Sequence, residues 1–232
     1  MITSRANEKL KLVRRLASRR QRDRLGLFVC EGEDLVDAAR GAGIEPVELL
    51  VAGENVEPAL LAEVSALAHP PRVIGIFRRA GLARGEVPTT GLALWRVGDP
   101  GNVGTLIRGA DAFGPAFVAL SSGCADPTGP KAMRASMGAI FRVPLIDFGE
   151  APRPWVALIP RGGRPLPAAP GTYVLGSERD GLPEEVLSRC DDRVTIPLAA
   201  GAESLNVAMA GTIALYELSR LRAIQTLSSP PV

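Results

Sequence analysis

The stretch DPGNVGTLIRGADAFG, from Asp99 to Gly114, brings an amide and a guanidinium together at the start of a predicted helix. Its Pro-Gly-Asn-x-Gly segment is typical of a tight turn, and the apolar spacing that follows predicts the helix. Because helical side chains lean toward the N-terminus, Arg108 is expected to cross Gly104 and reach Asn102 and the free N–H groups of the first turn. This arrangement predicts a phosphate or ribose pocket, whereas the alternative is an ordinary surface arginine.

A second loop, VLGSERDGLPEE at residues 174–185, places a carboxylate directly after an apolar strand. Gly176 is expected to let a flat ligand approach the backbone, and Glu178 supplies the carboxylate at the end of the strand. Alternatively, Glu178 is an ordinary turn residue that pairs with Arg179. The residues of this loop favour neither interpretation over the other.

A third loop leads into the last helix, in the stretch IPLAAGAESLNVAMAGTIALYEL at residues 196–218. Ser204 is well placed as the N-cap of a helix predicted over 205–222. That helix is apolar on two faces, which predicts either a central position between layers or packing against a second subunit. The cap accounts for Ser204, but it does not account for Asn206, which is a second polar group at the start of the helix.

Several other chemistries lack the residues they need. The three cysteines lie far apart without a Cys-x-x-Cys pair, and His69 is the single histidine, so we expect no metal site and no Ser-His-Asp triad. Neither Gly-x-Gly-x-x-Gly nor Gly-Lys-Ser/Thr is present, which argues against the common nucleotide-binding loops. No apolar run approaches ~18 residues and the basic N-terminus lacks an apolar signal region, so we expect no membrane segment and a cytoplasmic protein.

The three loops follow short apolar strands that alternate with helices. This alternation predicts an α/β fold with a mostly parallel sheet covered by helices on both faces. Ligands in such sheets bind beyond the carboxyl ends of the strands, so the loops after Val97, Gly176 and Leu198 are expected to form the site. The predicted strands are 92–97, 116–120, 140–146, 155–160, 172–177 and 193–198, and the predicted helices are 103–113, 131–138 and 205–222.

The N-terminal part predicts a separate, smaller α/β module. Its helices are expected over 7–20, 34–40 and 57–68, and its strands over 27–30, 47–51 and 73–77. A Gly-, Arg- and Pro-containing stretch without apolar periodicity then separates the two modules. We therefore predict an N-terminal domain at 1–78, a linker at 79–90, a second domain at 91–226 and a disordered tail at 227–232.

The positive charge of the chain is concentrated at its N-terminus. Residues 1–24 carry nine Lys or Arg residues against two acidic ones, although the whole chain has a net charge of only +2. A basic segment on a mildly acidic body favours a polyanion such as RNA, whereas the alternative is a solvated helix face. The predicted RNA-binding residues are Arg5, Lys9, Arg14, Arg15, Arg19, Arg20 and Arg22.

Taken in order, DPGNVGTLIRGADAFG, LGSERDGLPEE and IPLAAGAESLNVAMA resemble the three motifs of the SpoU/TrmH-type RNA ribose 2′-O-methyltransferases of the SPOUT superfamily. The resemblance extends over residues 90–218, and RASMGA at 134–139 is similar to the middle section of that family. The N-terminal module, with its sequence FVCEGEDLV, resembles the ribosomal-protein-like substrate-binding domain of many rRNA-modifying members. One departure is Arg179, which stands where many members have a small residue.

The resemblance implies an S-adenosylmethionine-dependent enzyme that methylates a ribose 2′-hydroxyl. It implies a deep trefoil knot in the second domain and a homodimer, and its N-terminal domain favours rRNA over tRNA as the substrate. A non-catalytic RNA-binding protein that retains the fold is the rival from another class. The catalytic positions implied are Asn102, Arg108, Glu178, Ser204 and Asn206, and the cofactor-binding positions are Gly176, Ile196, Pro197, Leu198 and Leu205.

Overall fold

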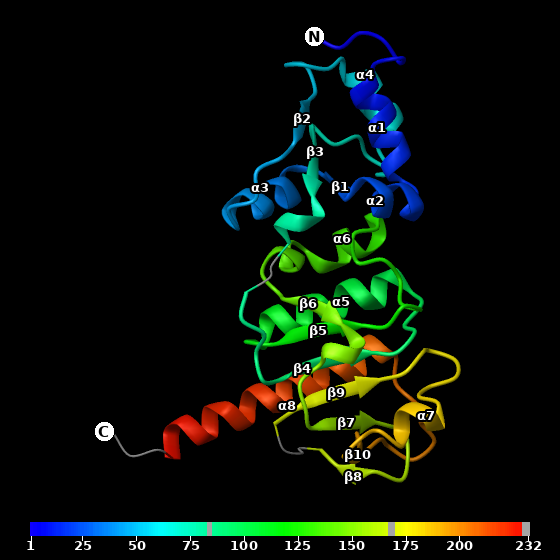
Figure 1. The fold of residues 1–232 in the computed structure, drawn as a ribbon, viewed down its shortest axis with the longest axis vertical. Helices are drawn as coiled ribbons and strands as arrows, with labels where there is room; N and C mark the ends of the chain where they lie inside the picture. Colours follow the sequence, from blue (N-terminus) through cyan, green and yellow to red (C-terminus); the bar gives the residue numbers. More distant parts are fainter. Residues whose placement is uncertain (83–84, 167–169, 229–232) are drawn as a thin grey trace.

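The computed structural model describes residues 1–82, 85–166 and 170–228, and for residues 224–228 it describes only the helical backbone. The chain forms two sheets that follow one another along the long axis of the molecule (Figure 1). The smaller sheet belongs to the N-terminal part and the larger one to the rest of the chain. Residues 79–90 lie between the two parts in the sequence.

The N-terminal sheet has three antiparallel strands in the order β1-β3-β2. Leu10, Val13 and Leu16 form one apolar stripe of α1, and this stripe packs with α4 against one face of the sheet. The single helix expected over 7–20 is two helices, because the chain turns at Ser18 between them. The elements are α1 (Glu8–Leu16), α2 (Arg19–Leu25), β1 (Leu27–Glu31), α3 (Glu33–Gly41), β2 (Glu48–Val51), α4 (Pro58–Val64) and β3 (Val73–Arg78).

The large sheet has seven strands in the order β6-β5-β4-β9-β7-β10-β8, and all of its strand pairs are parallel. The prediction of a mostly parallel α/β sheet is therefore confirmed. Its strands are β4 (Gly91–Leu94), β5 (Phe117–Leu120), β6 (Leu145–Asp147), β7 (Trp155–Leu158), β8 (Arg164–Pro165), β9 (Thr172–Leu175) and β10 (Asp192–Thr195). Its helices and 3-10 turns are η1 (Arg79–Gly81), α5 (Pro100–Ala112), α6 (Pro130–Ser136), η2 (Ala139–Phe141), η3 (Phe148–Glu150), α7 (Glu184–Leu187) and α8 (Val207–Ser228).

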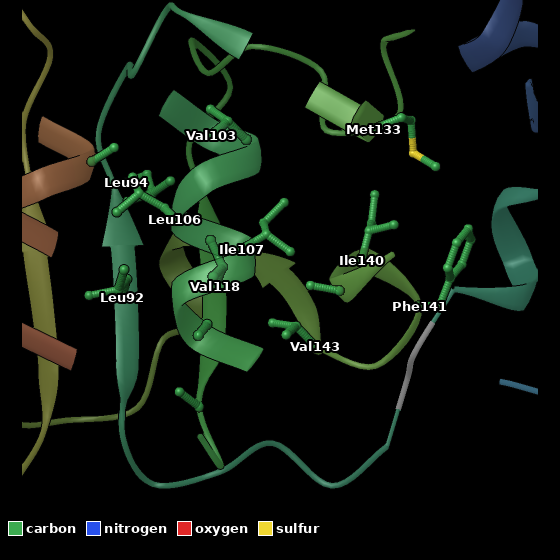
Figure 2. Packing of buried hydrophobic residues seen from close by; sticks show 14 of the residues in the cluster. Leu92, Leu94, Val103, Leu106, Ile107, Val118, Met133, Ile140, Phe141 and Val143 are labelled. Carbon is green, nitrogen blue, oxygen red and sulfur yellow. The ribbon is translucent and has the colours of Figure 1, made fainter. Parts of the chain in front are cut away.

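Alternating side chains along the central strands form a different core on each face of this sheet. Leu92 and Leu94 of β4 pack with Leu106 and Ile107 of α5, on the face that α8 also covers (Figure 2). Ala93, which lies between the two leucines, belongs instead to a cluster on the opposite face with the aromatic side chains of η3 and β7. Both faces are thus apolar, as the near-continuous apolar strands predicted.

Two predicted segments differ from the observed elements. The strand expected over 140–146 is instead the turn η2 followed by the short strand β6, because Pro144 has no N–H to donate to a sheet ladder. The last helix continues to Ser228, so residues 227 and 228 of the expected tail are helical, and residues 229–232 lie outside the described part. The trefoil knot implied by the resemblance stays a prediction.

The two parts of the molecule share a continuous apolar core. Phe28 of β1 stacks against Phe141 of η2 with ring centroids 6.3 Å apart, and Phe77 of β3 packs against the same ring in a tilted arrangement at 6.4 Å. Met133 and Ile140 of the large part belong to the same buried cluster. The N-terminal part is therefore packed directly on the α6–η2 region rather than tethered by a linker alone.

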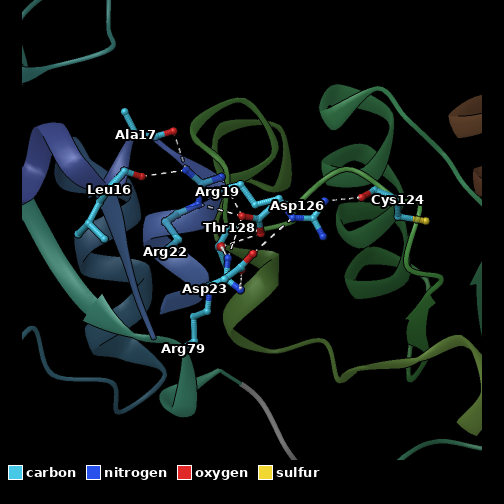
Figure 3. A network of polar contacts seen from close by, with 9 residues as sticks. All are labelled: Leu16, Ala17, Arg19, Arg22, Asp23, Arg79, Cys124, Asp126 and Thr128. Atoms are coloured by element: carbon cyan, nitrogen blue, oxygen red, sulfur yellow. Dashed lines mark hydrogen bonds and ion pairs between the residues drawn. The ribbon is translucent and has the colours of Figure 1, made fainter. Parts of the chain in front are cut away.

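A buried ion cluster lies beside this apolar contact (Figure 3). Arg22, on α2, donates from Nε to Oδ2 of Asp126 at 2.8 Å, and Arg79 donates from Nη2 to the same oxygen at 2.8 Å. Thr128 donates its N–H and hydroxyl to the other carboxylate oxygen at 2.9 and 2.7 Å. Because the Arg22 side chain is 5% exposed, the prediction that it contacts RNA is wrong: it joins the two parts of the protein.

The charge state of Asp126 follows from these contacts. Burial alone would raise the pKa of its carboxyl, but the hydrogen bonds from Thr128 and the guanidiniums of Arg79 and Arg22 together lower the pKa. Arg79 also pairs with Asp23 at 2.7 Å, so the first residue of the predicted linker is part of the interface. Asp126 is therefore an ionised, fully partnered carboxylate that holds the domains together.

Candidate functional site

The first and second predicted loops meet at the carboxyl edge of the sheet, because β4 and β9 are neighbouring parallel strands. Glu178 accepts hydrogen bonds from the N–H groups of Gly98 and Asp99, each at 3.1 Å, and from Nδ2 of Asn102 at 2.9 Å. Its carboxylate thus lies across the start of α5. The alternative pairing of Glu178 with Arg179 is not formed.

These contacts also set the ionisation of Glu178. Partial burial raises the pKa of the carboxyl, while the hydrogen bonds from Asn102 and from backbone N–H groups lower it, and the net shift is downward from the ordinary value of 4.5. Glu178 is therefore a carboxylate that accepts hydrogen bonds rather than a proton donor at neutral pH.

Asn206 joins the third loop to the other two. Its Nδ2 donates to Oδ1 of Asn102 at 3.1 Å, so Asn102 bridges Asn206 and Glu178. Its own Oδ1 accepts from the N–H groups of Ala208 and Met209 at 2.9 and 3.3 Å, which makes Asn206 the cap of α8. Ser204 was predicted to be this cap, and the prediction is wrong because the helix begins at Val207, leaving Ser204 in the preceding loop.

A cavity of about 450 Å³ opens beside these side chains. Glu178, Ser204 and Asn206 line it together with apolar groups from the ends of three neighbouring strands. Of the predicted cofactor-binding residues, the cavity is lined by Gly176, Ile196, Leu198 and Leu205 but not by Pro197. Residues 158–160 also line the cavity and were not predicted from the sequence. They follow β7, which runs parallel to β9 and therefore ends at the same edge of the sheet, so their position could have been predicted.

At Gly176, the backbone of the same loop packs closely against the Cα. A Cβ at this position would come within 2.1 Å of the carbonyl carbon of Gly181 and 2.4 Å of the nitrogen of Leu182. The loop therefore folds back on Gly176, and this contact gives the physical reason for the glycine. Gly176 also lines the cavity, so the expectation that a flat ligand approaches its backbone stays a prediction.

Arg108 does not follow the path expected over Gly104. A Cβ at Gly104 would lie 2.4 Å from the carbonyl oxygen of Ala132, so this space is filled by α6. Arg108 is instead exposed on α5 and is not part of the cavity wall. No described residue forms an ion pair or hydrogen bond with its guanidinium.

The first turn of α5 is not an open anion site either. Asp99 Oδ1 accepts from the N–H groups of Gly101 and Asn102 at 2.7 and 3.1 Å, and its Oδ2 lies 2.7 Å from Nζ of Lys131. The hydrogen bond from Lys131 is the main reason that the pKa of Asp99 is lowered. Sequence reasoning missed both residues, although an Asp directly before Pro-Gly is a helix-capping signal.

The basic N-terminal residues are mostly exposed but differ in what they contact. Arg5 and Arg14 lie near Glu63, and Lys9 pairs with Glu48 at 2.6 Å. Arg19 donates to the carbonyl oxygen of Cys124, at 3.0 Å. Arg15 and Arg20, by contrast, are exposed and form no ion pair or hydrogen bond within the described ranges.

The described residues contain neither a metal-binding cluster nor a membrane-spanning helix. No three His, Cys, Asp or Glu side chains there are grouped so that they would hold a metal ion. In the same part of the chain, no helix combines the length and apolar character needed to span a membrane.

Comparison with known proteins assigns both parts of the chain. Residues 90–216 match the model of the SpoU rRNA Methylase family, and residues 7–79 match the model of the MRM3-like substrate binding domain. The chain is 30% identical to RlmP of Bacillus subtilis, a 23S rRNA guanosine 2′-O-methyltransferase, over 94% of this chain and 98% of that protein.

Solved structures with the same fold include two that hold AdoMet. The AdoMet-bound rRNA methyltransferase from Sinorhizobium meliloti is 28% identical with a TM-score of 0.82, and the match covers 95% of this chain and 97% of that one. The SpoU methyltransferase AviRb from Streptomyces viridochromogenes, in complex with AdoMet, is 26% identical with a TM-score of 0.82, covering 94% and 98%. The family model spans more than half of the chain and contains all three hydrogen-bonded loops, so this chain belongs to the SpoU rRNA methylase family.

Proposed function

We propose that this protein transfers a methyl group from S-adenosylmethionine to a ribose 2′-hydroxyl of RNA, with 23S-type rRNA as the favoured substrate. The observation that carries this proposal is the hydrogen-bonded chain from Glu178 through Asn102 to Asn206, in which Glu178 and Asn206 line a cavity of about 450 Å³. Membership of the SpoU family supports the reaction class, and the hydrogen bonds among these three side chains support their part in the site.

The cavity suits the cofactor in size and in lining. Ligand pockets of this kind measure roughly 300–1,000 Å³ and are mostly apolar, with a few placed polar groups. Here Leu175, Leu205 and Ala210 supply apolar surface, and the carboxylate of Glu178 adds negative charge at the rim. S-adenosylmethionine, when bound, supplies an electrophilic methyl group on a cationic sulfur. We propose that Gly176, Ile196, Leu198 and Leu205 hold it, and that Pro197 does so only indirectly.

Asn102, Asn206 and Ser204 orient the reactants in this proposal. Asn102 is held at both ends of its amide, by Glu178 and by Asn206, so its position is fixed before any ligand binds. Such preorganisation lowers the barrier of a methyl transfer because the reaction needs an in-line arrangement more than a strong base. Ser204 is exposed in the loop before α8 and offers a hydroxyl at the same rim.

Arg108 binds the target phosphate and stabilises the oxygen as it loses its proton. A guanidinium remains protonated at any physiological pH, so electrostatic stabilisation is the role its chemistry allows, rather than that of a base. Its exposure suits this assignment, because its partner would be an RNA strand rather than a protein group. Glu178 acts on site geometry through its hydrogen bonds to the first turn of α5.

The N-terminal part supports rRNA as the substrate, since residues 7–79 match a substrate-binding domain. Its exposed arginines, Arg15 and Arg20, supply charge for a phosphate backbone. Four other basic residues have less charge available for RNA, because each already contacts a protein group: Arg5, Lys9, Arg14 and Arg19. A tRNA substrate is the rival within the same reaction class, and a cytoplasmic location stays a prediction.

A homodimer is the assembly we propose, based on α8. Ala208, Ala214 and Leu218 bury one face of this helix against the sheet. Met209 and Tyr216, on its outer side, are 56% and 50% exposed in the single chain. Apolar side chains on the outer face of α8, the helix that Asn206 caps, suit a second copy packed next to the site.

The proposal is tested by incubating the purified protein and radiolabelled S-adenosylmethionine with unmodified transcripts of 23S rRNA, 16S rRNA and tRNA. We expect label on the 2′-oxygen of a single 23S nucleotide, and binding of the cofactor in calorimetry. Label on tRNA alone would establish the rival substrate. Absence of cofactor binding together with retained RNA binding would overturn the enzymatic proposal in favour of a non-catalytic RNA-binding protein.

A further inference from the structure

Arg96 adopts a left-handed backbone conformation that glycine, and to a lesser extent Asn and Asp, adopt more readily than arginine. Its φ of 53° lies in the left-handed region, and its N–H donates to Oγ of Ser121 at 2.8 Å. The residue follows β4 and lies two positions before Gly98, whose N–H binds the carboxylate of Glu178. A strained arginine that close to the site calls for an explanation in terms of what its side chain does.

The stem of the Arg96 side chain is held in place while its charge remains free. A Cβ at Gly123 would come 2.7 Å from Cγ and 3.0 Å from Nε of Arg96, so the stem lies directly against the turn formed by residues 121–124. Arg96 is exposed, and no residue of the described part pairs with its guanidinium. The protein therefore presents a positioned cation to the solvent.

A second guanidinium reaches the same turn from the N-terminal part. Arg19 of α2 donates to the carbonyl oxygen of Cys124 at 3.0 Å (Figure 3), and its side chain is 53% exposed. Its distance to Asp23 is 3.7 Å, which is long for a charge-assisted hydrogen bond and leaves donors available. Arginines from both domains thus contact neighbouring residues, Gly123 and Cys124, beside the domain interface.

We propose that Arg96 and Arg19 bind successive backbone phosphates of the RNA where the strand passes from the N-terminal domain to the methylation site. This inference rests on the proposed RNA methyltransferase function. A guanidinium can donate two parallel N–H hydrogen bonds to one phosphate. Two guanidiniums held on the same turn can therefore bind two neighbouring phosphates of an RNA backbone. The strain at Arg96 is the cost of presenting its charge at this place.

The test separates strain from charge through three variants. Arg96→Gly removes both, Arg96→Gln keeps the stem and the strain but removes the charge, and Met137→Gly is a matched control. Met137 is the other non-glycine residue with a positive φ among those described, at 49°, and its uncharged side chain is 56% exposed. Each variant is measured by thermal unfolding, by S-adenosylmethionine calorimetry, and by filter binding of a 23S rRNA transcript over a salt series.

Arg96→Gly is expected to raise the Tm by about 2–4 °C and yet to weaken RNA binding about tenfold at 0.1 M salt, with the log–log salt slope smaller by about 1. Arg96→Gln is expected to weaken RNA binding equally without the gain in Tm. Met137→Gly should raise the Tm and leave the salt slope unchanged. Cofactor binding should be unaffected in all three.

An unchanged salt slope in both Arg96 variants would overturn the inference, whatever happens to the Tm. Methylation by the unsubstituted protein, measured in the same series, keeps the two proposals apart. If the unsubstituted protein binds RNA but does not methylate it, the enzymatic proposal fails while the Arg96 measurement still decides the RNA contact. If it methylates and the variants bind as well as it does, only the inference about Arg96 fails.

Discussion

Arg22 and Arg108 both carry guanidiniums that the sequence assigns to RNA, but they lie in opposite surroundings. Arg22 is buried at the domain interface and shares Asp126 with Arg79, whereas Arg108 is exposed on α5 and forms no described protein contact. The first arginine thus has a protein partner for its charge, and the second has its charge available. The comparison teaches that exposure and a missing partner, rather than residue type, identify the arginines that can bind an external phosphate.

The carboxylates of the two regions differ in the same way. Asp126 is enclosed by charged donors, while Glu178 is exposed and is held by one side-chain amide and by backbone N–H groups. Removing the Asp126 carboxylate leaves the buried guanidinium of Arg22 without a compensating negative charge. At Glu178, by contrast, water can accept most of the hydrogen bonds that the carboxylate accepts in the protein. The interface should therefore govern stability, and the site should govern activity.

The largest expected effect is on stability, from Asp126→Asn. The amide keeps the shape but removes the charge between Arg22 and Arg79, so we expect the free energy of unfolding to fall by about 3–5 kcal/mol. Urea denaturation measures this change. As a control, Asp111→Asn breaks the pair with Arg142, in which the Asp111 side chain is 27% and the Arg142 side chain 50% exposed, and should cost under about 1 kcal/mol. Equal losses in the two variants would contradict the distinction between interface and surface.

The largest expected effect on activity comes from Arg108→Lys. Lysine keeps one charge but loses the planar fork, so we expect kcat/KM to fall about 100-fold, which corresponds to about 2.7 kcal/mol. Cofactor binding and stability should not change, because the Arg108 guanidinium is not part of the cavity wall and forms no ion pair or hydrogen bond with a described residue. Arg40→Lys, at an exposed position on α3, serves as the matched control and should retain normal activity. Full methylation by Arg108→Lys would show that this arginine has no role at the site.

A smaller effect on both properties is expected for Asn206→Ala. The change removes the cap of α8 and the donor to Asn102, so the free energy of unfolding should fall by about 1 kcal/mol. Methylation should also slow, because Asn102 loses one of the two contacts that fix its amide. Ser204→Ala should leave the unfolding free energy unchanged in the same urea titration. A loss of stability in Ser204→Ala instead would restore the serine as the cap.

The smallest expected effect is the pH dependence that Glu178 adds to stability. Its pKa is lower in the folded protein than its ordinary value of 4.5, so its contribution is fully present above that pH. It is lost as the pH falls through the folded pKa. Because Glu178 is exposed, we expect the difference in unfolding free energy between the unsubstituted protein and Glu178→Gln to stay below about 1 kcal/mol. A difference that grew on acidification would mean that the pKa is raised.

Much of the fold was predictable because its signals are local. Short apolar strands alternating with helices indicated a parallel sheet, and the carboxyl ends of those strands predicted where the candidate site lies. The places where elements begin and end were less predictable. Strand β6 begins only after Pro144, and the chain turns at Ser18, so that one expected helix is two. Both depend on single residues within a longer favourable pattern, where periodicity is a weak guide to boundaries.

The sequence by itself determined the three loops, their order and the residue types at the strand ends. Only the tertiary structure decided which polar groups contact one another, because hydrogen bonds such as Asn206 to Asn102 join residues far apart in the chain. It also decided that Gly104 faces α6 and that Arg22 is buried against Asp126. The physical reason is that helical spacing gives the direction of a side chain but not the surface opposite it, which the packing of separate elements supplies.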